Sequence, residues 1–228
     1  MNIEIGISPS LRDSDITISL IWADGITASS YSEGKSPVFF EKALSELRND
    51  GFGTWDQAIR ERVRKMLRYG KYKPSGRSKP ASEFLLNAAQ ENRLAPISPP
   101  VDVNNIVSLS TGLPGSIFDA DKTGDRLLLR RGEKGESYVF NGSGQSIDLE
   151  DLLLVCRKDD QGEWRPCGNP VKDSMETKIS DLTRKVVGIL YIPKALSEEN
   201  IVSGSILYSS LLKEHCGAYD SGYRVISC

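Results

Sequence analysis

The segment VDVNNIVSLSTGLPGSIFD, residues 101–119, decides the expected fold. Residues 103–110 have the Asp/Asn-led start and the three-to-four-residue apolar spacing of a short helix. The sequence Gly-Leu-Pro-Gly at 112–115 ends that helix, because glycine adopts the left-handed conformation common after helices and proline does not continue one. The segment therefore predicts a helix followed by a glycine-rich turn.

Strands and helices are expected on both sides of this segment. Alternating or β-branched runs predict strands, and amphipathic runs predict helices, the second of which Thr54 can cap. Strands are expected at 3–7, 16–22, 127–131, 137–140, 152–157, 185–192 and 223–227, and helices at 38–50, 55–69, 81–93 and 197–215. This mixture predicts an α+β fold with a mixed sheet and packed helices.

Residues 1–228 are expected to form a single domain, because one domain usually holds about 100–200 residues. The sequence Ile-Ser-Pro-Pro at 97–100 divides it into a helix-rich N-terminal portion, 1–96, and the portion that carries the motif, 97–228. The composition, 39% hydrophobic and 26% charged, is that of a soluble globular protein. No apolar run approaches the roughly 18 residues of a membrane span, and the N-terminus lacks a secretion signal, so a cytoplasmic location is expected.

The cysteines and the histidine give no metal-binding pattern. Four cysteines contain no CxxC pair, and His215 is the single histidine, so we expect neither a metal nor another cofactor. A disulfide between Cys156 and Cys167 is conceivable, but a reducing cytosol argues against it. A Ser-His-Asp triad built on Ser116 and His215 is disfavoured, because His215 ends a predicted helix.

A local basic segment contrasts with the net charge of −2. Residues 60–79 contain nine Lys or Arg side chains against one acid, Glu61. Such a run is either a solvated face or a surface for phosphates. Lys71, Lys73, Arg77 and Lys79 lie in its Gly/Pro/Ser-rich loop and are the candidate phosphate-binding residues.

The opening segment resembles the tRNA-editing domain of the phenylalanyl-tRNA synthetase beta subunit. The similarity continues through LLLRRGEKGESYVF and SIDLEDLLLV to about residue 192, and YGKYKPSGRSKPASE resembles freestanding members of this group. It implies an editing-type fold, the aminoacylated 3′ end of tRNA as partner, and hydrolysis of mischarged aminoacyl-tRNA in trans by a positioned water. The 228 residues given leave no room for an aminoacylation core, so we do not expect this chain to be a complete phenylalanine-tRNA ligase.

The resemblance also implies site residues. Asn105 matches the family asparagine of the motif helix, while Asp102 either joins it or caps the helix. The amides of 112–116 either hold an oxyanion or form a plain turn. Ser116 and Ile189 stand where editing domains have histidine and glutamate, so tyrosine-specific editing is not implied.

The loop WRPCGNPVKDSMETKISDLT, residues 164–183, supplies further candidates. Asp173, placed beside Arg157, would anchor a substrate ammonium or orient a water, although Asp173 and Thr177 would equally serve to shape the turn. The candidate catalytic residues are thus Asn105, Ser116, Asp173 and Thr177, and the candidate substrate-binding residues are Gly112, Gly115, Arg157, Ser174 and Thr183.

Two other functions compatible with these residues stay open. A non-catalytic module with the same fold would bind tRNA or an amino acid, because fold does not determine function. A hydrolase of small amides or esters is the other alternative.

Overall fold

The computed structural model describes residues 1–31, 37–52, 55 and 57–228. One sheet has the strand order β10 (Asp220–Ser227), β2 (Ile16–Asp24), β9 (Lys185–Pro193) and β3 (Gly115–Asp119), with antiparallel neighbours throughout. The other has the order β1 (Glu4–Ile7), β4 (Arg126–Arg131), β7 (Leu153–Lys158) and β8 (Trp164–Gly168), of which only β1 and β4 are parallel. The expected α+β class with mixed strand directions is confirmed.

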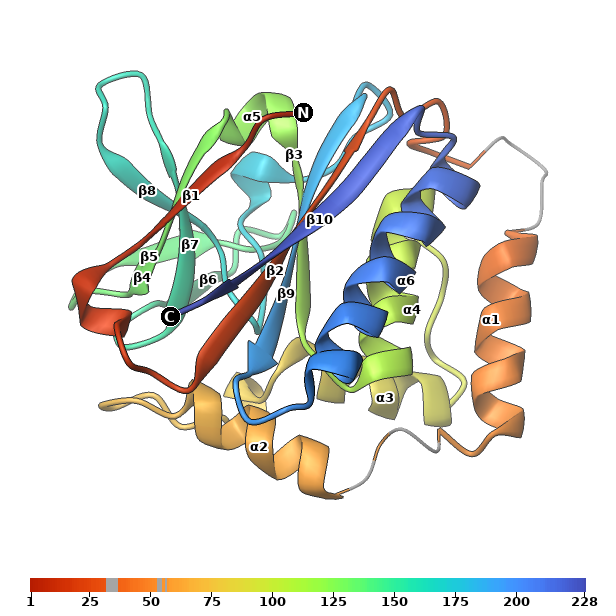
Figure 1. The fold of residues 1–228 in the computed structure, drawn as a ribbon, viewed down its shortest axis with the longest axis horizontal. Helices are drawn as coiled ribbons and strands as arrows, with labels where there is room; N and C mark the ends of the chain where they lie inside the picture. Colours follow the sequence, from red (N-terminus) through yellow and green to blue (C-terminus); the bar gives the residue numbers. More distant parts are fainter. Residues whose placement is uncertain (32–36, 53–54, 56) are drawn as a thin grey trace.

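The β10-β2-β9-β3 sheet lies between two layers. Helices α4 (Pro99–Thr111) and α6 (Glu198–Cys216) cover one of its faces, and the β1-β4-β7-β8 sheet lies on the other side (Figure 1). Strands β2 and β9 are therefore buried on both faces, which explains why their sequences are nearly continuous apolar runs.

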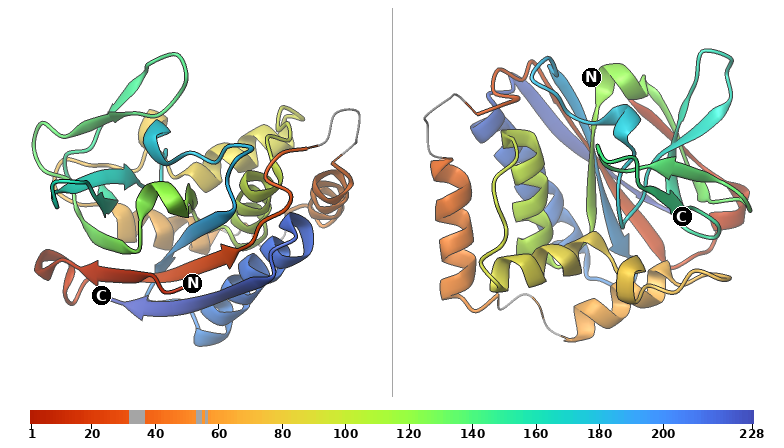
Figure 2. Two further views of the ribbon diagram at one scale, coloured as in Figure 1. Left: turned by 90° about the horizontal axis from the view of Figure 1, so that it is seen from above. Right: turned by 180° about the vertical axis from the view of Figure 1, so that it is seen from behind.

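The helices that precede α4 build a second apolar cluster. Helices α1 (Val38–Asn49) and α3 (Ala81–Gln90) pack against α4, and α2 (Gln57–Leu67) runs beneath the strand ends (Figure 2). The three expected helices are confirmed, although Thr54, the expected cap of α2, lies outside the described residues. The second cluster contains Phe40, Leu44, Phe52, Leu86, Ala89, Ile106 and Leu109.

Small elements complete the fold. The short helix α5 (Ala120–Thr123) follows β3, and strands β5 (Ser137–Val139) and β6 (Ser146–Asp148) form a hairpin. Three 3₁₀ turns, η1 (Pro9–Leu11), η2 (Gly76–Ser78) and η3 (Met175–Thr177), lie in loops. In the described ranges, no helix is long and apolar enough to cross a membrane.

The motif segment differs from the expectation in two respects. Helix α4 begins at Pro99 and Pro100, so these prolines are its first turn, where a missing N–H costs nothing. Gly112 ends α4 with φ 74°, as expected, but strand β3 follows at once. Ser116 therefore lies within a sheet strand instead of a turn.

Candidate functional site

A cavity of about 560 Å³ opens between α4, β3 and the loop that follows β8. Aliphatic side chains form much of its wall, from Ala81, Ile97, Val101, Ile117, Val171 and Ile179. Its polar lining comes from three asparagines, Asn104, Asn105 and Asn169, together with Asp173 and the serines and charged residues at its mouth. The mixture suits a guest with an apolar portion and a few hydrogen-bonding groups.

Asp173 is the acid that the fold fixes at this cavity. Its Oδ1 accepts hydrogen bonds from the Ser116 hydroxyl at 2.7 Å and the Asn169 amide at 3.3 Å, and its Oδ2 accepts from the Ile117 amide at 3.3 Å. Burial raises the pKa of Asp173 to about 7, although these three hydrogen bonds oppose the rise. Such a carboxyl exchanges its proton near neutral pH, as a general base must.

The loop that carries Asp173 is held at several points. The Asn169 side-chain oxygen accepts from the amides of Val171 and Lys172, while the Tyr138 hydroxyl donates to the Lys172 carbonyl at 2.6 Å. The amide of Ala81, at the start of α3, donates to the Pro170 carbonyl at 2.8 Å. These bonds preorganise Asp173 before any ligand arrives.

Helix α4 brings two neighbouring asparagines to the cavity. Asn104 is engaged by the fold, since its Oδ1 accepts from the Tyr208 hydroxyl at 2.8 Å. Asn105 is 7% exposed, and no hydrogen bond to its side chain occurs within the described part of the chain. Its amide is therefore available to a ligand. Asp102 does not line the cavity; it accepts from the Ile97 amide and the Tyr31 hydroxyl, and so secures the start of its own helix.

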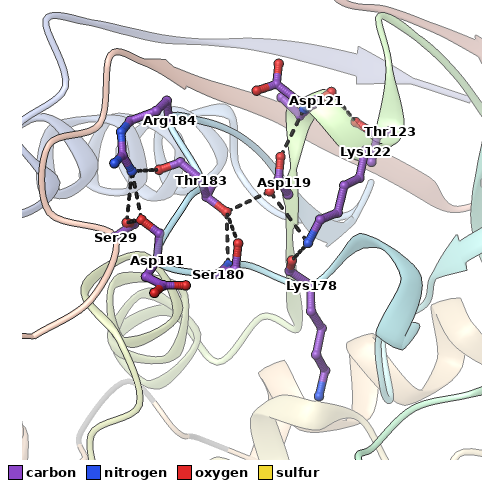
Figure 3. A network of polar contacts seen from close by, with 11 residues as sticks. Ser29, Asp119, Asp121, Lys122, Thr123, Lys178, Ser180, Asp181, Thr183 and Arg184 are labelled. Carbon is purple, nitrogen blue, oxygen red and sulfur yellow. Dashed lines mark hydrogen bonds and ion pairs between the residues drawn. The ribbon is translucent and has the colours of Figure 1, made fainter.

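The loop between η3 and β9 forms another wall of the cavity, and a network of polar contacts holds this loop in place (Figure 3). Thr183 donates to Asp119 Oδ2 at 2.7 Å and accepts from the Ser180 amide at 2.9 Å. Arg184 donates to the Ser29 hydroxyl and the Asp181 carbonyl. Ser29, Ser180 and Asp181 line the cavity, whereas Thr183 does not, so Thr183 shapes the wall without reaching the lumen.

Three further candidates do not reach this cavity. Arg157 forms an ion pair with Glu176 at 3.0 Å in a separate surface hollow, so the expected pairing with Asp173 is wrong. Thr177 is fully buried and donates to the Cys167 carbonyl, and Ser174 caps η3 by accepting from the Glu176 amide. The turn η3 directs Thr177 into the protein interior and Glu176 to the surface. Thr177 and Ser174 therefore shape the loop and do not line the cavity.

The fold already uses the amides of Gly112 and Leu113, while Pro114 has no N–H. The Gly112 amide donates to the Ser108 carbonyl and the Leu113 amide to the Thr111 hydroxyl. Gly115 and Ser116 lie in β3, opposite Leu190 and Ile189 of β9. Residues 112–114 therefore form a helix cap and a strand start. The Gly115 amide faces the open edge of β3, because Gly115 and Leu190 are a non-hydrogen-bonded pair, and the described chain offers this amide no acceptor. Gly115 does line the cavity, where a Cβ would lie 2.6 Å from the Asn104 side-chain oxygen.

Ser116 and Ile189 are directly opposed across two antiparallel strands, so their side chains share one face of the sheet. Both are fully buried and neither lines the cavity. Ser116 contacts the site through Asp173 at 2.7 Å and, at 3.4 Å, through the Asn169 carbonyl.

The basic segment leads to the cavity wall. Lys71 pairs with Glu150 at 2.8 Å, and Lys79 lies 4.5 Å from the centre of the Phe84 ring. Lys73 and Arg77 are exposed, and no acid in the described ranges pairs with either. Two residues after Lys79, Ala81 lines the cavity, so the cationic loop runs into its rim.

A comparison with known protein families identifies the family of this chain. The family model described as the B3/4 domain matches residues 69–197, more than half of the 228 residues. The chain belongs to the B3/4 domain family. The matched span of this B3/4 domain includes the basic loop, α4, β3 and the Asp173 loop.

Relatives of this B3/4 domain include beta subunits of phenylalanine-tRNA ligase. The subunit from Streptococcus pyogenes serotype M18 (strain MGAS8232) is 30% identical over 162 residues, covering 67% of this chain and 19% of the relative. The subunit from Bartonella quintana (strain Toulouse) is 30% identical over 95 residues, covering 41% of this chain and 11% of the relative. The chain thus spans about a fifth or less of these relatives, and the expected relationship to this subunit is confirmed.

A solved structure also aligns with the B3/4 domain. It is an N-terminal fragment of the phenylalanyl-tRNA synthetase beta subunit from Pyrococcus horikoshii, with a TM-score of 0.48 and 11% sequence identity. The alignment covers 99% of this chain and 50% of the fragment.

Three residues that support the site were not found from the sequence. Asn169 and Tyr138 fix the Asp173 loop, and Tyr191 contacts Ser116. The Gly-Asn-Pro sequence at 168–170 is a turn signal that would have indicated Asn169. Tyr138 and Tyr191 lie in strands and carry no comparable signal.

Proposed function

We propose that this B3/4 domain binds the aminoacylated 3′ end of tRNA and hydrolyses the ester of a mischarged amino acid in trans. The observation that carries the proposal is Asp173, held at the cavity with a pKa near 7. In its ionised form Asp173 accepts a proton from a water that attacks the ester carbonyl, and the protonated carboxyl returns that proton to the ribose oxygen as the ester C–O bond breaks. The amide of Asn105 donates to the developing oxyanion or to the ester.

The cavity and its rim match the two parts of this substrate. The aliphatic wall takes the amino-acid side chain, and the Asn105 amide takes the polar ester. Lys73 and Arg77 contact the phosphates of the acceptor end, because exposed cations without acidic partners gain most from polyanion binding. Kinship with phenylalanine-tRNA ligase beta subunits supports tRNA as the partner.

Deacylation of a panel of mischarged tRNAs tests this function. Each tRNA carries one radiolabelled amino acid, and loss of label is followed at pH 8 with and without the purified chain. At least one ester should be hydrolysed above the uncatalysed rate, while the correctly charged tRNA of that set remains intact. If every ester in the panel decays at the background rate, the hydrolytic function is refuted.

Reversing the two unpaired cations should weaken tRNA binding. For the double variant Lys73→Glu/Arg77→Glu, the slope of log affinity against log salt should fall in magnitude by about 1.4–1.8, since each of the two phosphate contacts contributes about 0.7–0.9. Filter binding at salt concentrations from about 50 to about 300 mM measures this slope. The matched control is Lys42→Glu/Lys213→Glu, with the same charge change on α1 and α6. Equal slopes for the two double variants would place the tRNA elsewhere.

A non-catalytic binding module is the second candidate. It is favoured by the amides of Gly112 and Leu113, which are occupied by the fold and so do not serve as oxyanion donors. Salt-dependent tRNA binding that the Lys73/Arg77 variant weakens, without deacylation of any ester, would support this candidate over hydrolysis.

A further inference from the structure

Tyr191 is a fully buried tyrosine on β9 whose hydroxyl has one partner. Its oxygen lies 3.0 Å from the Ser116 Oγ, and the described part of the chain offers it no other hydrogen bond. Residues 116 and 191 lie on adjacent strands, and Ser116 Oγ lies in turn 2.7 Å from Asp173 Oδ1. A line of three polar groups thus runs from the interior of the sheet to the cavity.

The direction of these hydrogen bonds follows from the proton count. Ser116 Oγ has two acceptors within reach, Asp173 Oδ1 at 2.7 Å and the Asn169 carbonyl at 3.4 Å. The nearer, ionised carboxylate is the stronger acceptor, so the single hydroxyl proton of Ser116 is directed to Asp173. Ser116 can then only accept from Tyr191, whose phenol is the donor. The relay runs Tyr191 O–H to Ser116 O–H to Asp173 Oδ1.

We propose that Tyr191 is a positioning residue that acts through Ser116 to hold Asp173 Oδ1, leaving Oδ2 directed to the ligand. Oδ1 is held by the Ser116 hydroxyl and the Asn169 amide, whereas in the described structure Oδ2 receives only the Ile117 amide at 3.3 Å. A lone pair of Oδ2 is therefore free for the attacking water. The inference rests on the cavity site of the proposed function and adds the group that orients its carboxylate.

The relay also stabilises the ionised form of Asp173. Hydrogen bonds in a chain polarise one another, so the phenol strengthens the bond that Ser116 donates. Other titratable groups act on Asp173 or face it: Lys178, whose charge favours ionisation and lowers the pKa, and Cys167, Tyr138 and Tyr208, whose own pKa values are raised by burial. The three buried groups stay neutral near pH 7, so the effect of the relay is separable from theirs.

Carboxyl titration by NMR tests the relay without tRNA. The chain is labelled with ¹³C at aspartate carboxyls, and the Asp173 resonance is assigned by its loss in Asp173→Asn. The wild-type midpoint is expected at about 7. Ser116→Ala should raise the midpoint by about 1–2 units, because it removes a hydrogen bond to a charged group. Tyr191→Phe should raise it by about 0.1–0.6 unit, because polarisation strengthens a hydrogen bond by about 10–30%.

A double variant separates a relay from a general packing effect. In the Ser116→Ala background, Tyr191→Phe should leave the Asp173 midpoint unchanged, because the intermediate is gone. Tyr208→Phe is the matched control. It removes an equally buried phenol that donates to Asn104 Oδ1 at 2.8 Å and whose oxygen lies 3.2 Å from the Ser116 backbone oxygen, and it should not shift the midpoint. Ser116→Cys replaces Ser116→Ala if the alanine variant does not fold.

Two outcomes would overturn the relay: no midpoint shift in Tyr191→Phe, or a shift that persists in the Ser116→Ala background. Neither depends on deacylation. A shift with the expected pattern in a chain that hydrolyses no ester would uphold the relay and refute the hydrolytic function alone.

Discussion

Replacing Asp173 with asparagine is expected to slow ester hydrolysis by about 10²- to 10⁴-fold, the range typical for loss of a positioned general base. Asparagine has nearly the same shape but does not accept a proton from water. Single-turnover deacylation of the most reactive tRNA in the panel measures the effect. Asp160→Asn, in the exposed turn between β7 and β8, makes the same chemical change away from the cavity and should retain the wild-type rate.

The pH dependence of hydrolysis should follow the same carboxyl. Its raised pKa means that Asp173 is protonated and inactive as a base below about pH 7, and ionised above it. The wild-type rate should therefore rise through pH 7 and level off, while the residual rate of Asp173→Asn should lack this step. A wild-type rate that is flat between pH 6 and pH 8, about one unit on either side of the midpoint, would remove Asp173 from the chemistry.

Stability should respond to pH with the opposite sign. Between the unfolded-state pKa of aspartate, about 4, and the folded value near 7, the native chain holds a proton that the unfolded chain has released. The contribution of Asp173 to the free energy of unfolding is thus largest below pH 4, falls as pH rises, and is constant above about pH 7. In Asp173→Asn, the free energy of unfolding measured by urea denaturation should lack this dependence on pH.

Phe118→Ala should produce the largest loss of stability, about 3–5 kcal/mol in the free energy of unfolding. Phe118 is fully buried on β3, and its ring packs so closely on β8 that a Cβ at Gly168 would lie 2.3 Å from the ring Cζ. Removing the ring leaves a cavity between the two sheets, directly behind Asp173. Urea denaturation with a common slope measures the change.

The control for this prediction is Phe84→Ala, the same substitution on α3 at a position that is 37% exposed. It removes a ring that contacts Lys79 and should cost less than about 1 kcal/mol. Comparable losses in the two variants would contradict the burial that the sheet packing assigns to Phe118.

The helices and most strands could be predicted because their sequences carry strong periodic patterns. Helices α1, α3 and α6 and strands β2, β4, β7 and β9 lie where apolar spacing placed them. Strands β3, β6 and β8 were missed. β3 follows directly on a Gly-Leu-Pro-Gly turn signal, β6 has only three residues, and β8 contains Pro166 at the edge of its sheet, where a strand tolerates a missing N–H.

The residues of the site could be predicted only in part. Asp173 and Asn105 were found because a motif and an acid in a turn-rich loop identify them. Arg157 was expected beside Asp173, but it pairs with Glu176, which η3 directs outward. The sequence pattern does not show which side chains of so short a turn face outward. Tyr191 was missed because the apolar run VVGILYIP reads as a buried strand, in which one hydroxyl gives no signal.

The central claim is that the cavity beside Asp173 receives the aminoacylated end of tRNA. The most direct test is an NMR titration of the ¹⁵N-labelled chain with a non-hydrolysable 3′-aminoacylamino-adenosine. We predict saturable shifts of the Asn105 side-chain amide and of the Ile117 and Asp173 backbone amides, which line the cavity. Shifts confined to the groove between α1 and α6, or none at saturating ligand, would contradict the account.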